Sequence, residues 1–114
     1  MKAIIHGIRY DTKTATEIIS REWSTYHPNL SGGEPTLEHQ RGVYRGKNGG
    51  LFGHIYDERG YGRDPHTGAT GAFVKEDAAI IPFESEAAAL IWAEEEGFDA
   101  DDLETAFGDQ IEDA

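Results

Sequence analysis

The stretch that decides the fold is Leu37–Tyr56, which reads LEHQRGVYRGKNGGLFGHIY. It contains two strand-like runs separated by a cluster of glycines around Asn48-Gly49. Asn-Gly is the preferred pair for a two-residue type I′ turn, because the twist of that turn matches the twist of the flanking strands. The stretch therefore predicts a β-hairpin centred on Asn48-Gly49.

This centre also predicts which side chains share a face. It places Arg45 opposite Phe52, Val43 opposite His54 and Arg41 opposite Tyr56, and side chains alternate between the two faces along a strand. One face is therefore expected to be basic and aromatic, and it gives a secondary candidate binding surface formed by Arg41, Arg45, Phe52, His54 and Tyr56. The opposite face, with Tyr44, Leu51 and Ile55, is the better core candidate.

Upstream of this hairpin, the sequence predicts a smaller hairpin and a helix. Residues 2–5 and 8–10 are short β-rich runs joined by His6-Gly7. Thr14 and Glu17 have the spacing of a capping box, in which each side chain satisfies a free backbone N–H group. We expect a helix over residues 15–23, followed by loops at His27–Asn29 and Ser31–Pro35.

Downstream, residues 58–71 are rich in glycine and are expected to form a loop. A short strand is predicted over residues 78–83, with Pro82 at its end or on a sheet edge, where a missing N–H group is tolerated. Ser85 is a suitable cap for a helix over residues 86–96, which Gly97 would end.

The core stripe of this helix is expected to comprise Ala87, Leu90, Ile91 and Trp92. Asp99 can then cap a last short helix that ends at Gly108.

The element order predicts an α+β fold with a small antiparallel sheet of about four to five strands and two or three helices packed on it. A chain of 114 residues suits a single domain spanning residues 1–114. That domain divides by charge into a neutral, sheet-rich part over residues 1–83 and an acidic, helical part over residues 84–114.

The acidic excess is confined to the second part. The whole chain has 22 Asp and Glu against 10 Lys and Arg, a net charge of -12. Residues 84–114 contain twelve acids and no Lys or Arg, whereas residues 1–83 are balanced. Adaptation to high salt would spread acids over every exposed element, so this distribution favours a local role. The excess also disfavours direct binding to nucleic acid or to an anionic membrane.

The sequence offers little support for catalytic or metal chemistry. Cysteine is absent, and the five histidines form no metal-binding spacing, so we expect no metal site and no cofactor. The absence of a signal peptide and of a long apolar run predicts a cytoplasmic protein without a membrane span.

The acidic segment is the main candidate for binding a partner. Acids at the end of a helix oppose its dipole, and none of them has a Lys or Arg nearby in sequence. Carboxylates along helices can imitate a row of phosphates, so a host protein with a basic nucleic-acid-binding groove is the expected partner. The candidate residues are Glu94, Glu95, Glu96, Asp99, Asp101, Asp102 and Glu104.

Two alternatives remain open for these acids. They could form a solvated face that keeps a small protein soluble. They could also be held within the molecule by Arg41 and Arg45. If these arginines are exposed instead, the bipolar surface would suit self-association, including a homodimer.

Three patches of the chain resemble a family of small phage and mobile-element proteins. Their opening has the form I-x-G-x-R-Y-D-T-x-T-A, matched here by residues 5–15 (IHGIRYDTKTA), with His6 where that family tends to have Asn. Later matches are residues 44–52 (YRGKNGGLF) and residues 80–87 (IIPFESEA), followed by Trp92. The resemblance implies a non-enzymatic inhibitor of host defence, of the anti-CRISPR type, acting in the host cytoplasm on a CRISPR effector.

An enzyme and a structural protein are the alternatives. Residues 4–7 (IIHG) are also similar to the opening of ADP-ribosyltransferase domains, in which a strand-borne His binds the nicotinamide dinucleotide. That resemblance would give this role to His6 and the role of the later acid to Glu84 or Glu86. A structural phage protein that only self-associates is the third hypothesis.

Overall fold

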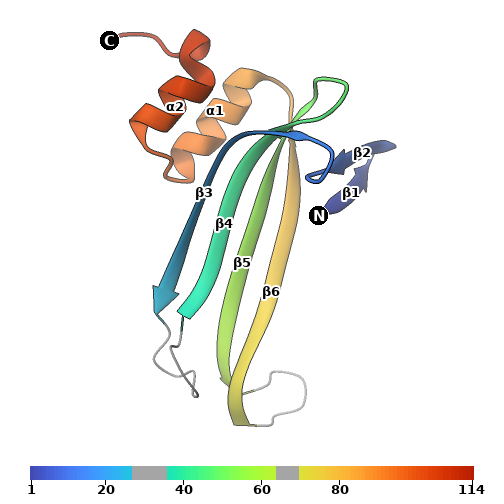
Figure 1. Cartoon of the computed structure of the whole chain (residues 1–114), viewed down its shortest axis with the longest axis vertical. Helices are drawn as coiled ribbons and strands as arrows, with labels where there is room; N and C mark the ends of the chain where they lie inside the picture. The colour runs from blue at the N-terminus through green and yellow to red at the C-terminus, as the bar shows by residue number, and fades with distance from the viewer. Residues whose placement is uncertain (27–35, 64–69) are drawn as a thin grey trace.

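The structure is a computed structural model that describes residues 1–26, 36–63 and 70–114, so the loops predicted at His27–Asn29 and Ser31–Pro35 lie outside the described residues. Six strands precede two helices and a short 3-10 helix (Figure 1). In chain order they are β1 (Lys2–Ile5), β2 (Ile8–Asp11), β3 (Thr16–Tyr26), β4 (Thr36–Arg45), β5 (Leu51–Arg63), β6 (Thr70–Phe83), α1 (Glu86–Glu95), α2 (Ala100–Phe107) and η1 (Gly108–Gln110).

The strands form two antiparallel sheets. β3, β4, β5 and β6 make a four-stranded sheet in sequence order, and β1 and β2 make a separate hairpin. The two helices lie together at one end of the large sheet, and the small hairpin lies at the same end (Figure 1). The predicted α+β class, with an antiparallel sheet and two helices, is confirmed.

β3 occupies the segment for which a helix was predicted, so that prediction is wrong. Instead of capping a helix, Thr14 and Ala15 donate their N–H groups to the Asp11 carbonyl in a turn. From Ile19 to Trp23, buried or half-buried residues alternate with exposed ones, and this period of two belongs to a strand. The helical stripe was misleading because Arg21, although charged, is one of the inward-facing residues.

The pairing of β4 with β5 is shifted by one residue from the predicted register. Arg45 pairs with Leu51, and Tyr44 pairs with Phe52. A type I′ turn would require a positive φ at Asn48, but in this turn only Gly49 has one, at 87°. Gly49 donates its N–H to the Gly46 carbonyl, which closes a longer turn followed by a left-handed glycine.

The register shift redistributes the predicted faces. Arg41, Val43, Arg45, Leu51 and Ile55 share one face of the sheet, which we call the helix face because α1 and α2 pack on it. Tyr44, Phe52, His54 and Tyr56 share the other face, which we call the hairpin face because Tyr10 of β2 packs edge-on against Phe52. The predicted secondary surface therefore does not exist as one surface, since its two arginines and its three aromatic or imidazole rings lie on opposite faces.

The last two strands are longer than the sequence suggested. β5 continues to Arg63 and β6 begins at Thr70, so the predicted loop over residues 58–71 is wrong at both ends, and its middle, residues 64–69, lies outside the described residues. β6 is an edge strand, which confirms the place expected for Pro82.

The core lies between the helix face and the two helices. Its buried members are Ile19, Val43, Leu51, Ala89, Leu90, Ala93, Phe98 and Phe107. The helix can lie close to the sheet at Gly53, where an added Cβ would come within 2.9 Å of Phe83 and 3.2 Å of Trp92. Of the predicted stripe, Leu90 is buried and Trp92 is half-buried, but Ala87 and Ile91 are exposed because α1 packs through its alanines.

The helix boundaries agree closely with the sequence. The Ser85 hydroxyl accepts the Ala88 N–H at 3.1 Å, and the Asp99 carboxylate accepts the Asp102 N–H at 2.9 Å. Gly97, with φ 82°, ends α1. The Phe98 N–H reaches back to the Ala93 carbonyl, and its ring folds into the core, as a Schellman motif requires.

Candidate functional site

Six of the seven predicted acids form an exposed surface on the two helices. Glu94, Glu95, Asp99, Asp101, Asp102 and Glu104 are all exposed, whereas Glu96 is half-buried. Both helices contribute, because α1 ends just before the turn at Gly97 and α2 begins just after Asp99. The surface is therefore formed by the C-terminal end of α1 and the first two turns of α2.

Glu96 turns toward the sheet rather than toward solvent. Arg41 Nε donates to Glu96 Oε2 at 3.1 Å, and Arg21 donates through a terminal guanidinium nitrogen to the Glu96 carbonyl at 2.6 Å. No Lys or Arg lies near the end of α1 in sequence, but the fold brings Arg21 of β3 and Arg41 of β4 to it. Glu96 anchors the helices and does not belong to the exposed acidic surface.

Arg41 links this anchor to the interior of the sheet. It donates to both carboxylate oxygens of Asp57, at 2.9 and 3.1 Å, and its side chain is only 12% exposed. Burial alone would raise the pKa of Asp57, but the hydrogen bonds from Arg41 and His39 outweigh it and lower that pKa. The pKa of Arg41 is raised, because its two carboxylate partners outweigh the opposing effect of burial.

Aromatic rings complete this partly buried polar cluster. The Trp23 and His39 rings stack at a centroid distance of 5.1 Å, and the Arg21 guanidinium lies 4.3 Å from the Trp23 ring. His39 Nδ1 lies 2.8 Å from Asp57 Oδ1, and His39 Nε2 lies 2.9 Å from the Thr25 hydroxyl. The cluster fixes the orientation of Arg41, and thereby of the helices.

Arg45 makes a second, more exposed link between sheet and helices. One of its terminal nitrogens donates to Glu86 Oε1 at 2.9 Å, and both side chains are a little under half exposed. Together with the Arg41–Glu96 pair, this confirms the alternative that Arg41 and Arg45 hold acids of the helical part within the molecule. Of the seven candidate acids, however, the alternative holds for Glu96 alone, because Glu86 is not one of them and these are the two ion pairs that acids of residues 84–114 make within the described part of the chain.

Several of the exposed acids also stabilise their own helix. Asp99 caps α2, and Asp101 and Asp102 lie in its first turn, where the dipole favours negative charge. Glu94 and Glu95 lie at the opposite end of a helix, where the same dipole disfavours them. Of the predicted acidic surface, Glu94, Glu95 and Glu104 are therefore the exposed members with no cap or ion pair in the described residues.

The hairpin face carries a second group of acids that sequence reasoning missed. Glu58 pairs with Glu76 across β5 and β6, and the Glu58 carboxylate accepts the Glu38 N–H at 2.8 Å. The Tyr56 hydroxyl donates to Glu58 Oε2 at 2.8 Å, and this hydrogen bond raises the pKa of Tyr56 strongly. A row of glutamates across three strands could be found only if β5 and β6 were known to extend beyond residue 57.

The remaining ring of the predicted secondary surface is half-buried. His54 lies near Tyr44, with ring centroids 6.4 Å apart. Burial lowers the pKa of His54, and the charge of Arg41 lowers it further. Phe52 is only 1% exposed, so it belongs to the floor of the hairpin face and not to a binding surface.

The residues of the ADP-ribosyltransferase resemblance have other positions in this structure. His6 is in the turn between β1 and β2, with φ 51°, and not on a strand. Glu86 begins α1 and is paired with Arg45 on the helix face, and Glu84 is exposed just before it. His6 therefore lies in a turn, whereas the ADP-ribosyltransferase resemblance implies a histidine on a strand.

The described residues contain neither a candidate group of metal-ligating side chains nor a candidate membrane-spanning helix. Within residues 1–26, 36–63 and 70–114, no group of three or more His, Asp or Glu side chains is arranged to hold a metal ion. Among the helices described, none has the length and apolar character needed to cross a membrane.

The comparisons with known proteins give no match. No protein-family model, no curated protein and no solved structure matches the chain.

Proposed function

We propose that this chain is a non-enzymatic binding protein whose helical acidic surface occupies the basic nucleic-acid-binding groove of another protein. The observation that carries the proposal is that some acids of residues 84–114 are paired with arginines and others are not. Glu86 and Glu96 are paired with arginines of the sheet, whereas Glu94, Glu95 and Glu104 are exposed and unpaired within the described residues. Charge placed where it costs stability is expected to serve recognition.

The physics of such a surface favours a cationic partner. Charges on one side of a small protein steer an oppositely charged groove toward it and disfavour free nucleic acid. The surface is rigid, because α1 and α2 pack on the sheet through Leu90, Ala93 and Phe107. A rigid acidic helix pair loses little conformational entropy on binding.

The identity of the partner comes from the resemblance to small phage and mobile-element proteins. It suggests inhibition of a host defence effector in the host cytoplasm, of which a CRISPR interference complex is the first to test. In this hypothesis, the chain competes with DNA for the effector and performs no chemistry.

The test is competition with DNA, using a variant that spares the fold. Glu94→Lys, Glu95→Lys and Glu104→Lys are combined, because these acids have no cap or ion pair to lose among the described contacts. The matched control combines Glu17→Lys, Glu22→Lys and Glu76→Lys, which change the net charge equally on the hairpin face. Binding of labelled DNA by purified CRISPR effectors is measured by electrophoretic mobility at low salt and at about 0.5 M salt.

We expect the wild type and the control to displace DNA from one effector at low salt but not at high salt. The helix variant should fail to displace it, although its circular dichroism spectrum stays unchanged. Equal inhibition by the wild type and the helix variant would contradict the proposal. Loss of inhibition in the control alone would transfer the function to the glutamates of the hairpin face.

A further inference from the structure

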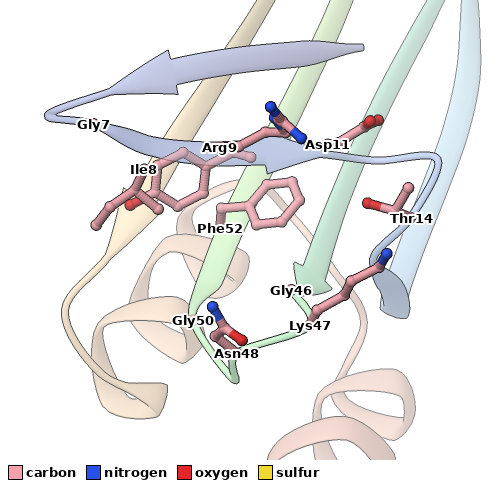
Figure 2. Close-up of a pocket in the computed structure, with 11 residues that line it drawn as sticks. Gly7, Ile8, Arg9, Asp11, Thr14, Gly46, Lys47, Asn48, Gly50 and Phe52 are labelled. Carbon is pink, nitrogen blue, oxygen red and sulfur yellow. The ribbon is translucent and has the colours of Figure 1, made fainter.

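A pocket on the hairpin side of the molecule has no part in the proposed function. It lies between β2 and the turn that joins β4 to β5, and its volume is about 610 Å³. Figure 2 shows Ile8, Arg9 and Asp11 of β2 on one side, Lys47 and Asn48 of the turn on the other, and the Phe52 ring between them. Pockets of about 300–1,000 Å³ are the usual size for small organic ligands.

The floor of the pocket is apolar and aromatic. Phe52 is 1% exposed and is held between Tyr10, which meets it edge-on at 5.4 Å, and Tyr44, which stacks on it at 5.5 Å. Ile8 is 56% exposed beside this floor, an unusual position for a large apolar side chain. Phe52 therefore supports the floor from beneath, and Ile8 and the half-buried Tyr10 are the apolar and aromatic side chains that a ligand could contact.

The rim of the pocket is cationic, although the chain as a whole is strongly acidic. Lys47 lies in the turn and has no ion-pair partner among the described residues, whereas the Arg9 side chain leaves β2 on the side away from Phe52 and the turn (Figure 2). The one carboxylate of the lining, Asp11, already accepts the Lys13 N–H at 2.9 Å. An anion would therefore find one free cation, Lys47, at the rim of the pocket.

The turn between β4 and β5 adds free backbone N–H groups and leaves space for a ligand. Within the described part of the chain, the N–H groups of Lys47 and Asn48 donate to no carbonyl, since the turn is closed by Gly46 and Gly49. Successive free N–H groups next to a left-handed residue form a concavity that suits anions, and Gly49 is that residue. Gly50 leaves this edge open, because a Cβ added there would meet nothing within 4 Å.

From these features together, we propose that the pocket binds an aromatic monophosphate the size of a mononucleotide. The planar ring would lie against Ile8 and Tyr10, and the phosphate would contact Lys47 and the free N–H groups of the turn. An inorganic anion would leave the apolar side chains unused, and an uncharged ring would leave Lys47 and these N–H groups unused. The site is independent of the acidic helices, which pack on the opposite face of the sheet.

The experiment is an NMR titration of the full chain with three probes. AMP carries both a ring and a phosphate, adenosine carries only the ring, and inorganic phosphate carries only the anion. We expect AMP to shift the amide signals of residues 8–11 and 46–52, with an affinity at least about tenfold above that of either other probe. Equal shifts by inorganic phosphate and AMP would overturn the proposal, and so would the absence of shifts with AMP.

Two matched variants test the cationic rim. Lys47→Ala should weaken AMP binding by about fivefold to tenfold, because it removes one charge-assisted contact. Lys13→Ala removes the same charge from an exposed residue near the pocket but outside its lining, so it should leave the affinity unchanged. Both residues are exposed, and neither substitution should affect folding. Equal weakening by the two variants would show a non-specific charge effect and would overturn the proposal.

Discussion

At the scale of single residues, Arg41 is the side chain on which the arrangement of the molecule depends most. It contacts Asp57 of β5 and Glu96 at the end of α1, and it covers part of the Trp23 ring at 5.1 Å. Its removal would leave two partly buried carboxylates without a cation, and an unpaired buried charge costs more than the pair itself contributes.

Arg41→Met is therefore expected to lower the free energy of unfolding by about 2 kcal/mol. Arg59→Met is the control, because the pair of Arg59 with Asp77 is 3.3 Å long and Arg59 is 65% exposed; its effect should stay within about 0.5 kcal/mol. Urea denaturation of the three proteins measures both values. Equal effects of the two substitutions would show that Arg41 is no more than a surface residue.

His54 gives the unfolding free energy a dependence on pH near neutrality. Because burial lowers its pKa in the folded state, the unfolded chain takes up the proton more readily. The stabilisation is complete above the unfolded value of about 6.5 and is lost as the pH falls below it. We expect His54→Gln to lose less unfolding free energy than the wild type between pH 8 and pH 5. Parallel losses in urea denaturation would contradict this expectation.

At the scale of elements, the two helices differ in where their acids lie relative to the helix dipole. Glu95 lies at the C-terminal end of α1, and Asp101 lies in the first turn of α2. The helix dipole therefore makes the loss of one negative charge favourable at Glu95 and unfavourable at Asp101.

Glu95→Gln should raise the free energy of unfolding by about 0.5 kcal/mol, and Asp101→Asn should lower it by a similar amount. Each substitution removes one charge from the same acidic surface, so the general repulsion changes equally and the sign reports the helix position. Thermal unfolding followed by circular dichroism can resolve the difference. A change of the same sign in both variants would mean that overall charge, and not the dipole, dominates.

The elements that the sequence predicted correctly are those whose boundaries are local. The caps at Ser85 and Asp99 and the end of α1 at Gly97 depend on contacts within a few residues. β3 was mistaken for a helix because its pairing with β4, and not its own pattern of residues, decides its conformation. The predicted hairpin register is wrong by one residue, and this reverses the faces of β4 relative to those of β5.

The candidate site was likewise predictable only where it depends on local sequence. The exposed acids follow from helices that the sequence located, and their composition is visible in residues 84–114. The role of Glu96 was not predictable, because Arg41 and Arg21 are 55 and 75 residues away along the chain. The pocket beside Phe52 was also missed, since it depends on β2 being packed against the turn of another hairpin.

At the scale of the whole molecule, charge is separated between two layers. The sheet-rich part is neutral, and its arginines hold the helices through Glu86 and Glu96. The outer surface of the helices carries the excess, which repels itself at low ionic strength. Salt weakens this exposed repulsion more than it weakens the partly buried Arg41 pairs.

The melting temperature is therefore expected to rise between about 20 mM and about 0.5 M NaCl. The combined variant Glu94→Lys, Glu95→Lys and Glu104→Lys should show a smaller rise, because it relieves the repulsion on the helices directly. The control with Lys at positions 17, 22 and 76 should keep more of the rise, since the same charge is changed on the other face. Differential scanning calorimetry in two salt concentrations measures all three proteins. A melting temperature that falls with salt would mean that attraction between the layers exceeds repulsion within the helices. The exposed acids would then not destabilise the fold, and their stability cost could not be used as an argument for a role in recognition.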